Sequence, residues 1–409
     1  MELSKMKSLY KAPLTLAIAA ATLGATPSAF AADEPSLNIN LRTLYFNRDI
    51  HGDENQIAAS QAVRVDYVSP FYNNLIGFDA SVFGALKLDG RDNDQGSRVL
   101  KNDGNDTDSY AKLGQAYLKL KLGENSELRA GRMVLGTPLL QDDDARSTPS
   151  STQAITLDTN IAGADLYAIY SDRAVDVNGT KFNEYKDVNG DDYDLYVIGG
   201  GYTFANGLSV HAAHGVADEF QQTYLNASYP VALANGDSIL IDAYYYDGSD
   251  DGTLYGDNYE SNLFNLAGSY NTGNLSLTLS YQNIGGDDDY NYGWGGEDSN
   301  VLMTWNSVQY LDFNWADEQS LQVRADYNVA AVPGLSLMAR HTEGWDIDSG
   351  AETDLEERET NLEAKYVFQG GTFEGLSLRA RVAHVETEHP EINDVDEFRL
   401  IAEYGFSAL

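Results

Sequence analysis

Cationic side chains recur at alternate positions near the end of the chain, a spacing that could carry anions. Arg379 and Arg381 share one face of the segment Leu376–Glu386, and Arg399 lies on the corresponding face of Glu397–Ser407. A guanidinium group offers a carboxylate two parallel hydrogen bonds, and a row of such groups passes an anion from one weak site to the next. The full candidate track consists of Arg42, Arg64, Lys119, Lys121, Arg129, Arg324, Arg340, Lys365, Arg379, Arg381 and Arg399.

Acidic residues that are expected to point the same way leave a second interpretation open. These residues are Asp66, Asp79, Asp326, Glu363 and Glu403. Ion pairs between them and the cations could simply hold the structure together. The chain as a whole is acidic, with a formal net charge of −37, so a basic track would be a local feature. We expect some cations to be paired and a net basic track to remain.

The segments that carry the cations alternate between polar and apolar residues with a period of two, as β-strands do. In Glu397–Ser407, for example, Phe398, Leu400 and Tyr404 share the face opposite to Arg399. A sheet in water buries its apolar face in a core, but here charged residues occupy the face that would lie inside. This inversion suits a barrel in a membrane, which is apolar outside and polar inside.

Short turns alternate with long acidic stretches along the chain. Turns are predicted at 71–74, 123–126, 161–163, 205–207, 230–237, 272–274, 331–334 and 369–375. A bacterial barrel with both ends in the periplasm has an even number of strands, so the weakly alternating segment Met303–Asn314 is assigned to a loop, which leaves about 18 strands, 8 turns and 9 external loops. The predicted fold is therefore all-β, a transmembrane antiparallel up-and-down β-barrel around a water-filled lumen, with long external loops.

The first 31 residues have the features of an export signal. Lys5, Lys7 and Lys11 form a positive region, Leu14–Ala25 is apolar, and Ala29–Ala31 fits a cleavage site. The apolar run is shorter than the roughly 20 residues that a membrane-spanning helix needs. We expect residues 1–31 to be a signal peptide and residues 32–409 to form one barrel domain in the bacterial outer membrane.

Composition agrees with strands joined by turns and excludes several functions. The 409 residues include 37 Gly and 27 Tyr but only 9 Pro and no Cys, a composition that favours strands over helices. The lack of Cys excludes disulfides and thiol chemistry. The strong negative charge argues against a nucleic-acid partner, because a polyanion would be repelled.

Several motifs that follow one another along the chain are similar to those of a known family. They include LRTLYFNRD at 41–49, AGR at 130–132, PLLQDDDAR at 138–146, NSVQYLDFN at 306–314, DYN at 326–328, VPGL at 332–335, LEAKYV at 362–367, LSLR at 376–379 and RLI at 399–401. Together they resemble the OprD family of substrate-specific outer-membrane porins. The resemblance implies a monomeric barrel of about 18 strands whose third and seventh external loops constrict the lumen. It also implies passive uptake of small carboxylate-bearing solutes, such as amino acids, small peptides or aromatic acids.

The resemblance places the third loop at Leu135–Thr152 and the candidate constriction residues in two loops. Those residues are Asp142, Asp143, Asp144, Arg146, Tyr310 and Asp312. Pro138 and Pro149 stiffen the third loop, so its charges could project into the lumen. Asp312 and Tyr310 could bind an ammonium group while wall arginines hold the carboxylate of the same solute. The alternative is that the third-loop acids are solvated or pair with Arg146.

Other functions have weaker signals. Residues 247–252 and 187–191 resemble calcium loops but lack a required glutamate or glycine, so neither a metal nor a cofactor is expected. The sequence contains no H-E-x-x-H, G-x-S-x-G or P-loop motif, which argues against an enzyme. Aromatic residues between Tyr281 and Trp305 could stack on sugars, so a channel for chitooligosaccharides is the alternative function. The expected partners are small solutes, outer-membrane lipid and lipopolysaccharide, and the barrel is expected to be a monomer, with a weak trimer as the alternative.

Overall fold

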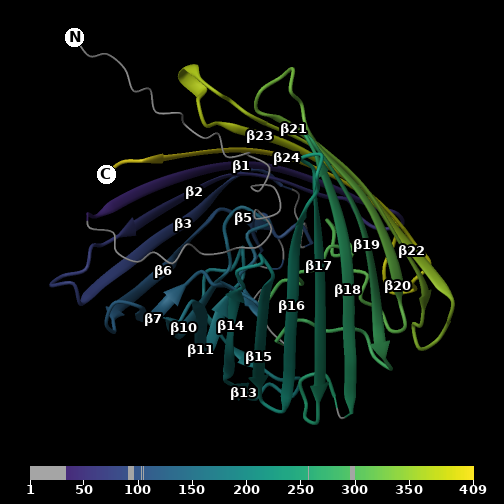
Figure 1. Cartoon of the computed structure of the whole chain (residues 1–409), viewed down its shortest axis with the longest axis horizontal. Coiled ribbons are helices and arrows are strands. Elements are labelled where there is room, and N and C mark those ends of the chain that lie inside the picture. Colours follow the sequence, from purple (N-terminus) through teal and green to yellow (C-terminus); the bar gives the residue numbers. More distant parts are fainter. Residues whose placement is uncertain (1–33, 91–95, 103, 105, 257, 295–299) are drawn as a thin grey trace.

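The computed structural model describes residues 34–409 except 91–95, 103, 105, 257 and 295–299, so the expected signal peptide lies outside the described residues. Within the described residues, eighteen long strands, with the short β12 (Asn183–Lys186) and β13 (Asp192–Tyr193), form one 20-stranded antiparallel sheet (Figure 1). The long strands are β1 (Ser36–Ile50), β2 (Gln56–Val68), β3 (Ile76–Gly90), β6 (Tyr110–Lys121), β7 (Ser126–Met133), β10 (Ser151–Ile161), β11 (Ala164–Val175), β14 (Leu195–Thr203), β15 (Ser209–Ala217), β16 (Phe220–Ala232), β17 (Ser238–Asp250), β18 (Tyr259–Thr272), β19 (Leu275–Gly286), β20 (Gln319–Asn328), β21 (Leu335–Ile347), β22 (Leu355–Val367), β23 (Ser377–Thr387) and β24 (Val395–Ser407).

Smaller elements lie in the connections. The short strands are β4 (Lys101–Asn102), β5 (Thr107–Asp108), β8 (Gly136–Thr137) and β9 (Leu140–Gln141), and a 3₁₀ turn, η3, spans Gly371–Phe373. No helix in the described parts of the chain is long and apolar enough to cross a membrane.

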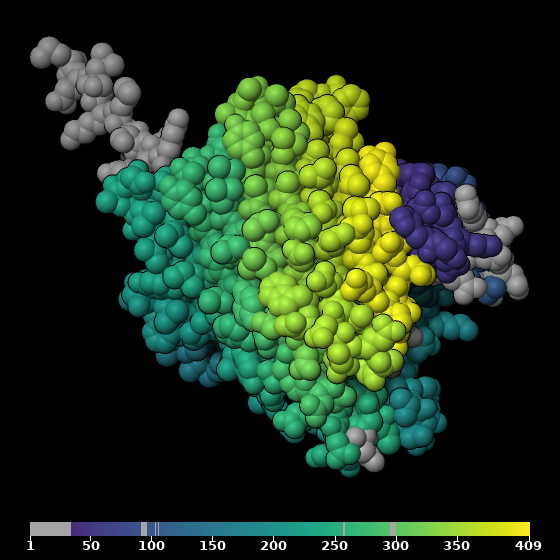
Figure 2. All heavy atoms as spheres, turned by 90° about the vertical axis from the view of Figure 1, so that its right-hand side faces the viewer, coloured from purple at the N-terminus to yellow at the C-terminus, as the bar shows by residue number. Residues whose placement is uncertain are grey.

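The sheet closes because the first and last strands pair with each other. Arg42 of β1 lies opposite Ala62 of β2 on one side and opposite Glu403 of β24 on the other. In Figure 2 the C-terminal strands, in yellow, accordingly lie beside the N-terminal strand, in purple. Among the described residues, each of the eighteen long strands therefore pairs with a long strand on both sides, and the predicted up-and-down antiparallel barrel is confirmed.

The two faces of the wall have opposite character. On β23 and β24, Leu378, Val382 and Leu400 point outward and are 42%, 41% and 46% exposed, whereas the inward Glu397 and Arg399 are 1% and 2% exposed. An apolar outer band with a charged inner face is what a lipid bilayer requires. The polarity inversion predicted from the alternation is therefore confirmed.

The connections follow the predicted short and long pattern. Each of the eight predicted turns joins two neighbouring long strands of the described sheet. The segment Met303–Asn314 contains no strand and belongs to the connection between β19 and β20, as the parity argument requires. We refer to residues 134–150 as L3, residues 287–318 as L7 and residues 388–394 as L9, the third, seventh and ninth external loops.

Apolar side chains also fill part of the interior, which the simple inversion did not predict. Phe220, Tyr224, Tyr246, Tyr290 and Trp294 are almost completely buried and belong to one cluster that joins the wall to L7. Phe220 contacts Trp294 edge-on, with ring centroids 5.5 Å apart. These rings therefore hold L7 against the inner wall by apolar packing.

Candidate functional site

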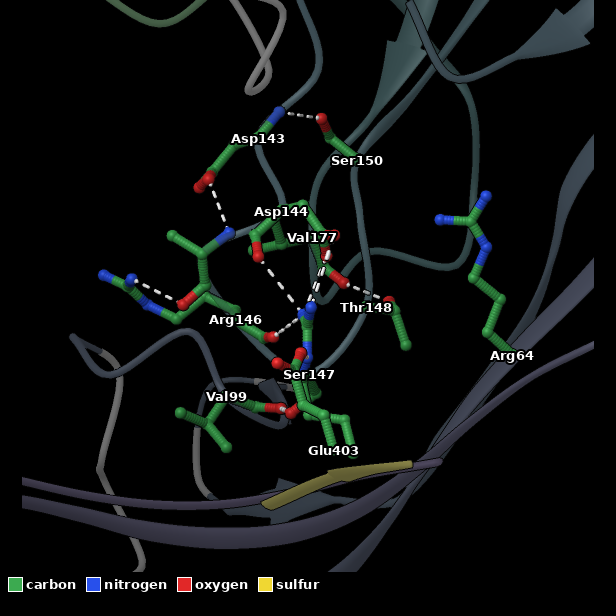
Figure 3. Close-up of polar contacts among 12 residues, drawn as sticks. Arg64, Val99, Asp143, Asp144, Arg146, Ser147, Thr148, Ser150, Val177 and Glu403 are labelled. Carbon is green, nitrogen blue, oxygen red and sulfur yellow. Dashed lines mark hydrogen bonds and ion pairs between the residues drawn. The ribbon is translucent and has the colours of Figure 1, made fainter. Parts of the chain in front are cut away.

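L3 folds into the barrel and is held from several sides. Tyr110 of β6 lies 3.0 Å from Thr148 through their hydroxyl groups. Thr148 also donates to the carbonyl of Val177 at 2.9 Å, and Ser147 donates to the carbonyl of Val99 at 2.6 Å (Figure 3). These bonds tie L3 to the wall and to the two loops that flank it.

Arg42 of β1 connects the barrel wall to L3. Its Nε donates to Glu403 of β24 at 2.8 Å, and its Nη1 donates to the Asp144 carboxylate at 2.7 Å. The same Nη1 donates to the carbonyl of Arg146 at 2.7 Å. One guanidinium therefore links the first strand, the last strand and the loop that projects toward them.

The three consecutive acids of L3 have different surroundings. Asp142 is buried and accepts hydrogen bonds from the Leu135 N–H and from the hydroxyl groups of Ser150 and Thr152. Burial raises the pKa of Asp142 to about 7. Asp143 accepts from the backbone of Ala145.

Of the predicted cluster, only Asp144 forms an ion pair with a wall cation in the described part of the barrel. Asp142 and Asp143 instead hold the backbone of L3 in place.

Three arginines surround the buried ring of Phe46. The guanidinium carbons of Arg48, Arg146 and Arg399 lie 5.1, 5.4 and 5.2 Å from the ring centroid. Arg48 and Arg399 share one carboxylate, that of Glu397, at 2.7 and 2.6 Å. Burial lowers the pKa of Arg146 to about 9, and the neighbouring Arg399 and Arg48 contribute to this shift.

Arg48 was missing from the predicted track although the sequence contained its signal. Arg48 is six residues after Arg42 on β1, so the two side chains lie on the same face of the strand. The polar face of this strand is predicted to end at Arg42, because Leu44 and Phe46, which lie between the two arginines, are apolar. Those two residues face inward and are buried against Val99 and Leu100 of the connection between β3 and β6.

The predicted L7 residues lie inside the barrel but are engaged by the loop and the wall. The Asp312 carboxylate accepts from the hydroxyl group of Tyr292 at 2.8 Å and from Ser307, and burial raises the pKa of Asp312. The Tyr310 ring lies 4.7 Å from the Arg48 guanidinium. Tyr310 and Arg48 thus bring L7 next to the arginines that contact L3.

The remaining predicted cations line the inner wall and mostly have acidic partners. The ion pairs are Arg64–Asp66 at 2.8 Å, Lys119–Asp79 at 2.6 Å, Arg129–Asp158 at 2.7 Å, Arg324–Asp326 at 2.7 Å, Arg379–Glu363 at 2.6 Å and Arg381–Glu363 at 3.2 Å. Arg340 donates to Asn361 at 2.6 Å and Lys121 donates to Asn74 at 2.8 Å. Lys365 lies opposite Arg379 on the neighbouring strand. Ion pairs are therefore common along the inner wall, and the carboxylate of Glu363 is shared by two arginines.

A cavity of about 370 Å³ lies beneath L3 and contains charges of both signs. Arg42, Arg64, Asp144 and Glu403 contribute to its lining. Arg64 also lines a second cavity of about 530 Å³. In Figure 3 the Arg64 guanidinium stands apart from the L3 contacts. The lining of the first cavity offers donors for a carboxylate and acceptors for an ammonium group.

Two of the L7 aromatic residues predicted to stack on sugars are packed in the interior. Tyr290 and Trp294 are fully buried, and Trp294 donates its indole N–H to the carbonyl of Leu139 in L3. Trp294 contacts Phe220 edge-on, and Tyr290 contacts Tyr246 in a tilted arrangement. Nothing in this arrangement supports the chitooligosaccharide alternative.

A closed barrel with an apolar outer wall, short turns at one end and long loops folded into its interior has the architecture of an outer-membrane porin. The model of the family described as "outer membrane porin, OprD family" matches residues 28–408. The chain therefore belongs to the OprD family of bacterial outer-membrane porins, which are channels rather than enzymes.

Two named relatives match the sequence of this chain over almost its full length. Porin D of Pseudomonas aeruginosa is 32% identical, with 99% of this chain and 100% of the relative covered. Porin-like protein GalP of Pseudomonas putida is 28% identical over the same shares. The solved structure of Pseudomonas aeruginosa OccK9 (OpdG) has a TM-score of 0.84 at 28% identity, covering 92% of this chain and 99% of that one. Pseudomonas aeruginosa OpdK, solved with vanillate, has a TM-score of 0.83 at 24% identity, covering 92% and 100%.

Proposed function

We propose that this porin mediates passive diffusion of small solutes that bear a carboxylate, including amino acids, small peptides and aromatic acids. The observation that carries the proposal is that two carboxylates on the wall of β22, β23, β24 and β1 are each shared by two guanidinium groups. There Arg379 and Arg381 share Glu363, while Arg48 and Arg399 share Glu397.

Where two guanidinium groups share one carboxylate, positive charge is left uncompensated locally, and fixed positive charge in a narrow aqueous channel attracts anions. The shared pairs also keep each site weak, because part of every guanidinium is already satisfied. A solute carboxylate can then move between neighbouring arginines without being trapped at one of them.

The mixed lining beneath L3 favours zwitterions over simple anions. Arg42 and Arg64 can hold a carboxylate while Asp144 or Glu403 accepts an ammonium group. Within this proposal Tyr310 and Asp312 support the constriction, and Asp312 binds an ammonium group only after giving up its bonds to Tyr292 and Ser307.

The test is uptake by liposomes that contain wild-type or Arg379→Ala/Arg381→Ala protein. We expect the double variant to lose several-fold more uptake of carboxylate solutes than of neutral solutes of equal size. The matched control is Arg358→Ala, which removes an arginine whose side chain is 49% exposed and paired with Glu386. Equal losses for charged and neutral solutes would contradict the proposal.

We further propose that residues 1–31 are removed as a signal peptide and that the mature barrel functions as a monomer in contact with lipid and lipopolysaccharide. The apolar outer face of the wall supports the lipid contact. N-terminal sequencing of the membrane-extracted protein tests cleavage after Ala31.

A further inference from the structure

The end of L7 is fastened to β22 by buried glutamates. Glu359 accepts hydrogen bonds from the backbone N–H groups of Tyr310 and Leu311, at 3.1 and 2.8 Å. Glu357 Oε2 accepts the indole N–H of Trp315 at 2.9 Å. Glu357 and Glu359 are 2% and 0% exposed, so water does not compete for these bonds.

A third buried glutamate, Glu318 of L7, lies against Glu357. Glu318 Oε2 accepts the backbone N–H of Trp315 at 3.1 Å. Its other oxygen, Oε1, and Glu357 Oε1 are both buried, and neither has a hydrogen-bond donor among the described residues. A Cβ atom at Gly344 would lie 2.0 Å from Glu318 Oε1, so the carboxyl group occupies space that the glycine leaves on β21.

The surroundings of this pair are mostly acidic. The charged and titratable groups around it are Glu359 on β22, Asp289 and Asp312 on L7, and His389 on L9. On β21, Gly344 lies against Glu318, and the cation Arg340 interacts electrostatically with Glu359. His389 stacks on Trp315 with centroids 3.7 Å apart. Burial raises the pKa of Glu318 well above its usual range, and the charge of Glu357 raises it further.

Two buried carboxylates with no cation between them are strongly disfavoured. A single proton resolves the problem, since the carboxylic acid then donates an O–H to the neighbouring carboxylate. We propose that one proton held between Glu318 and Glu357 latches the end of L7 to the barrel wall, and that loss of this proton releases a loop that narrows the channel.

The direction of the pH effect follows from proton linkage. The latched state holds a proton that the released, solvated carboxyls would lose, so the latch is strongest at low pH and weakens as pH rises. Between the ordinary carboxyl pKa of about 4.3 and the raised value in the latched state, the ratio of released to latched channels grows about tenfold per pH unit. We therefore expect a looser, noisier constriction on the alkaline side.

Single-channel recording in planar bilayers between about pH 5 and about pH 9 tests the latch. Wild-type channels should show increasing open-channel noise and current as pH rises. The current through Glu318→Gln channels should show low noise at every pH, because the amide N–H of the new side chain donates permanently to Glu357. Glu356→Gln is the matched control, since Glu356 lies next to Glu357 on β22 but is exposed, and it should keep the wild-type response.

Glutamine at the other member of the pair tests the same latch. Glu357→Gln retains an oxygen to accept the Trp315 indole N–H and gains a donor toward Glu318, so it should also abolish the pH response. Wild-type current that is equally steady at both ends of the pH range would overturn the proposal. So would a full pH response in both glutamine variants. Neither of these results bears on the proposed class of solutes, because the recordings use only a simple salt and no carboxylate solute.

Discussion

Trp294 of L7 donates its indole N–H to the backbone carbonyl of Leu139 in L3, and this hydrogen bond joins the two loops that lie inside the barrel. Trp294 is fully buried and contacts Phe220 of β16 edge-on. The wall, L7 and L3 thus meet at a single ring. Any change that moves this ring should alter both loops together, since they are coupled through it.

Gly215 of β15 leaves the space that the Trp294 ring fills. A Cβ atom at Gly215 would lie 2.5 Å from Cη2 of Trp294. We expect Gly215→Ala to displace the indole, to destabilise the protein by about 1–3 kcal/mol, and to increase the passage of neutral solutes. Liposome swelling with neutral solutes of increasing size measures the effect. Gly268→Ala on β18 serves as the control, because a Cβ there meets no atom within 4 Å; identical behaviour of the two variants would contradict the coupling.

The Asp144 carboxylate neutralises part of the positive charge of Arg42 at the constriction. Its side chain is 47% exposed, so the ion pair contributes only about 0.2–1 kcal/mol. Replacing Asp144 with Asn should leave the Arg42 charge less compensated and raise preference for anions by up to about fivefold. The reversal potential across a salt gradient reports this preference. Asp165→Asn is the comparison, since Asp165 is exposed on β11 and accepts from Asn160 rather than from an arginine; an equal shift in both variants would argue against a specific effect at Arg42.

Much of the fold could be predicted because a membrane barrel imposes a simple rule on its strands. The alternation around Arg399 and the turn at 331–334 reflect local backbone geometry and the polarity of the two faces. Parity then assigned Met303–Asn314 to a loop, since an extra strand would put the chain terminus on the wrong side of the membrane. None of these inferences requires knowing which residues touch across the lumen.

The contacts across the lumen could not be predicted in the same way. Asp142 and Asp144 are two positions apart in one acidic run, yet one is buried under its own loop and the other reaches Arg42. Phe46 belongs to the inward face although it is apolar, because Val99 and Leu100 of the β3–β6 connection and Arg146 of L3 cover it. Such outcomes depend on how L3 and L7 fold back on the wall, and single-strand periodicity carries no information about that.

Asp142 should make the stability of L3 depend on pH. Its carboxyl group has a pKa raised to about 7 by burial, so the folded protein holds a proton there that an unfolded chain would lose near pH 4. Stability should therefore fall as pH rises between about 4 and about 7, by at most about 1.4 kcal/mol per pH unit.

The variant Asp142→Asn cannot ionise, so it should lose this part of the pH dependence. It should also be less stable at low pH, because an amide offers only one acceptor oxygen to the donors at Leu135, Ser150 and Thr152. Thermal unfolding in detergent at a series of pH values measures both effects. The control is Asp143→Asn, which changes the adjacent, partly exposed acid and should keep the wild-type slope. If Asp142→Asn and wild type lose stability in parallel across this pH range, the titrating group lies elsewhere and the buried carboxyl of L3 is not responsible.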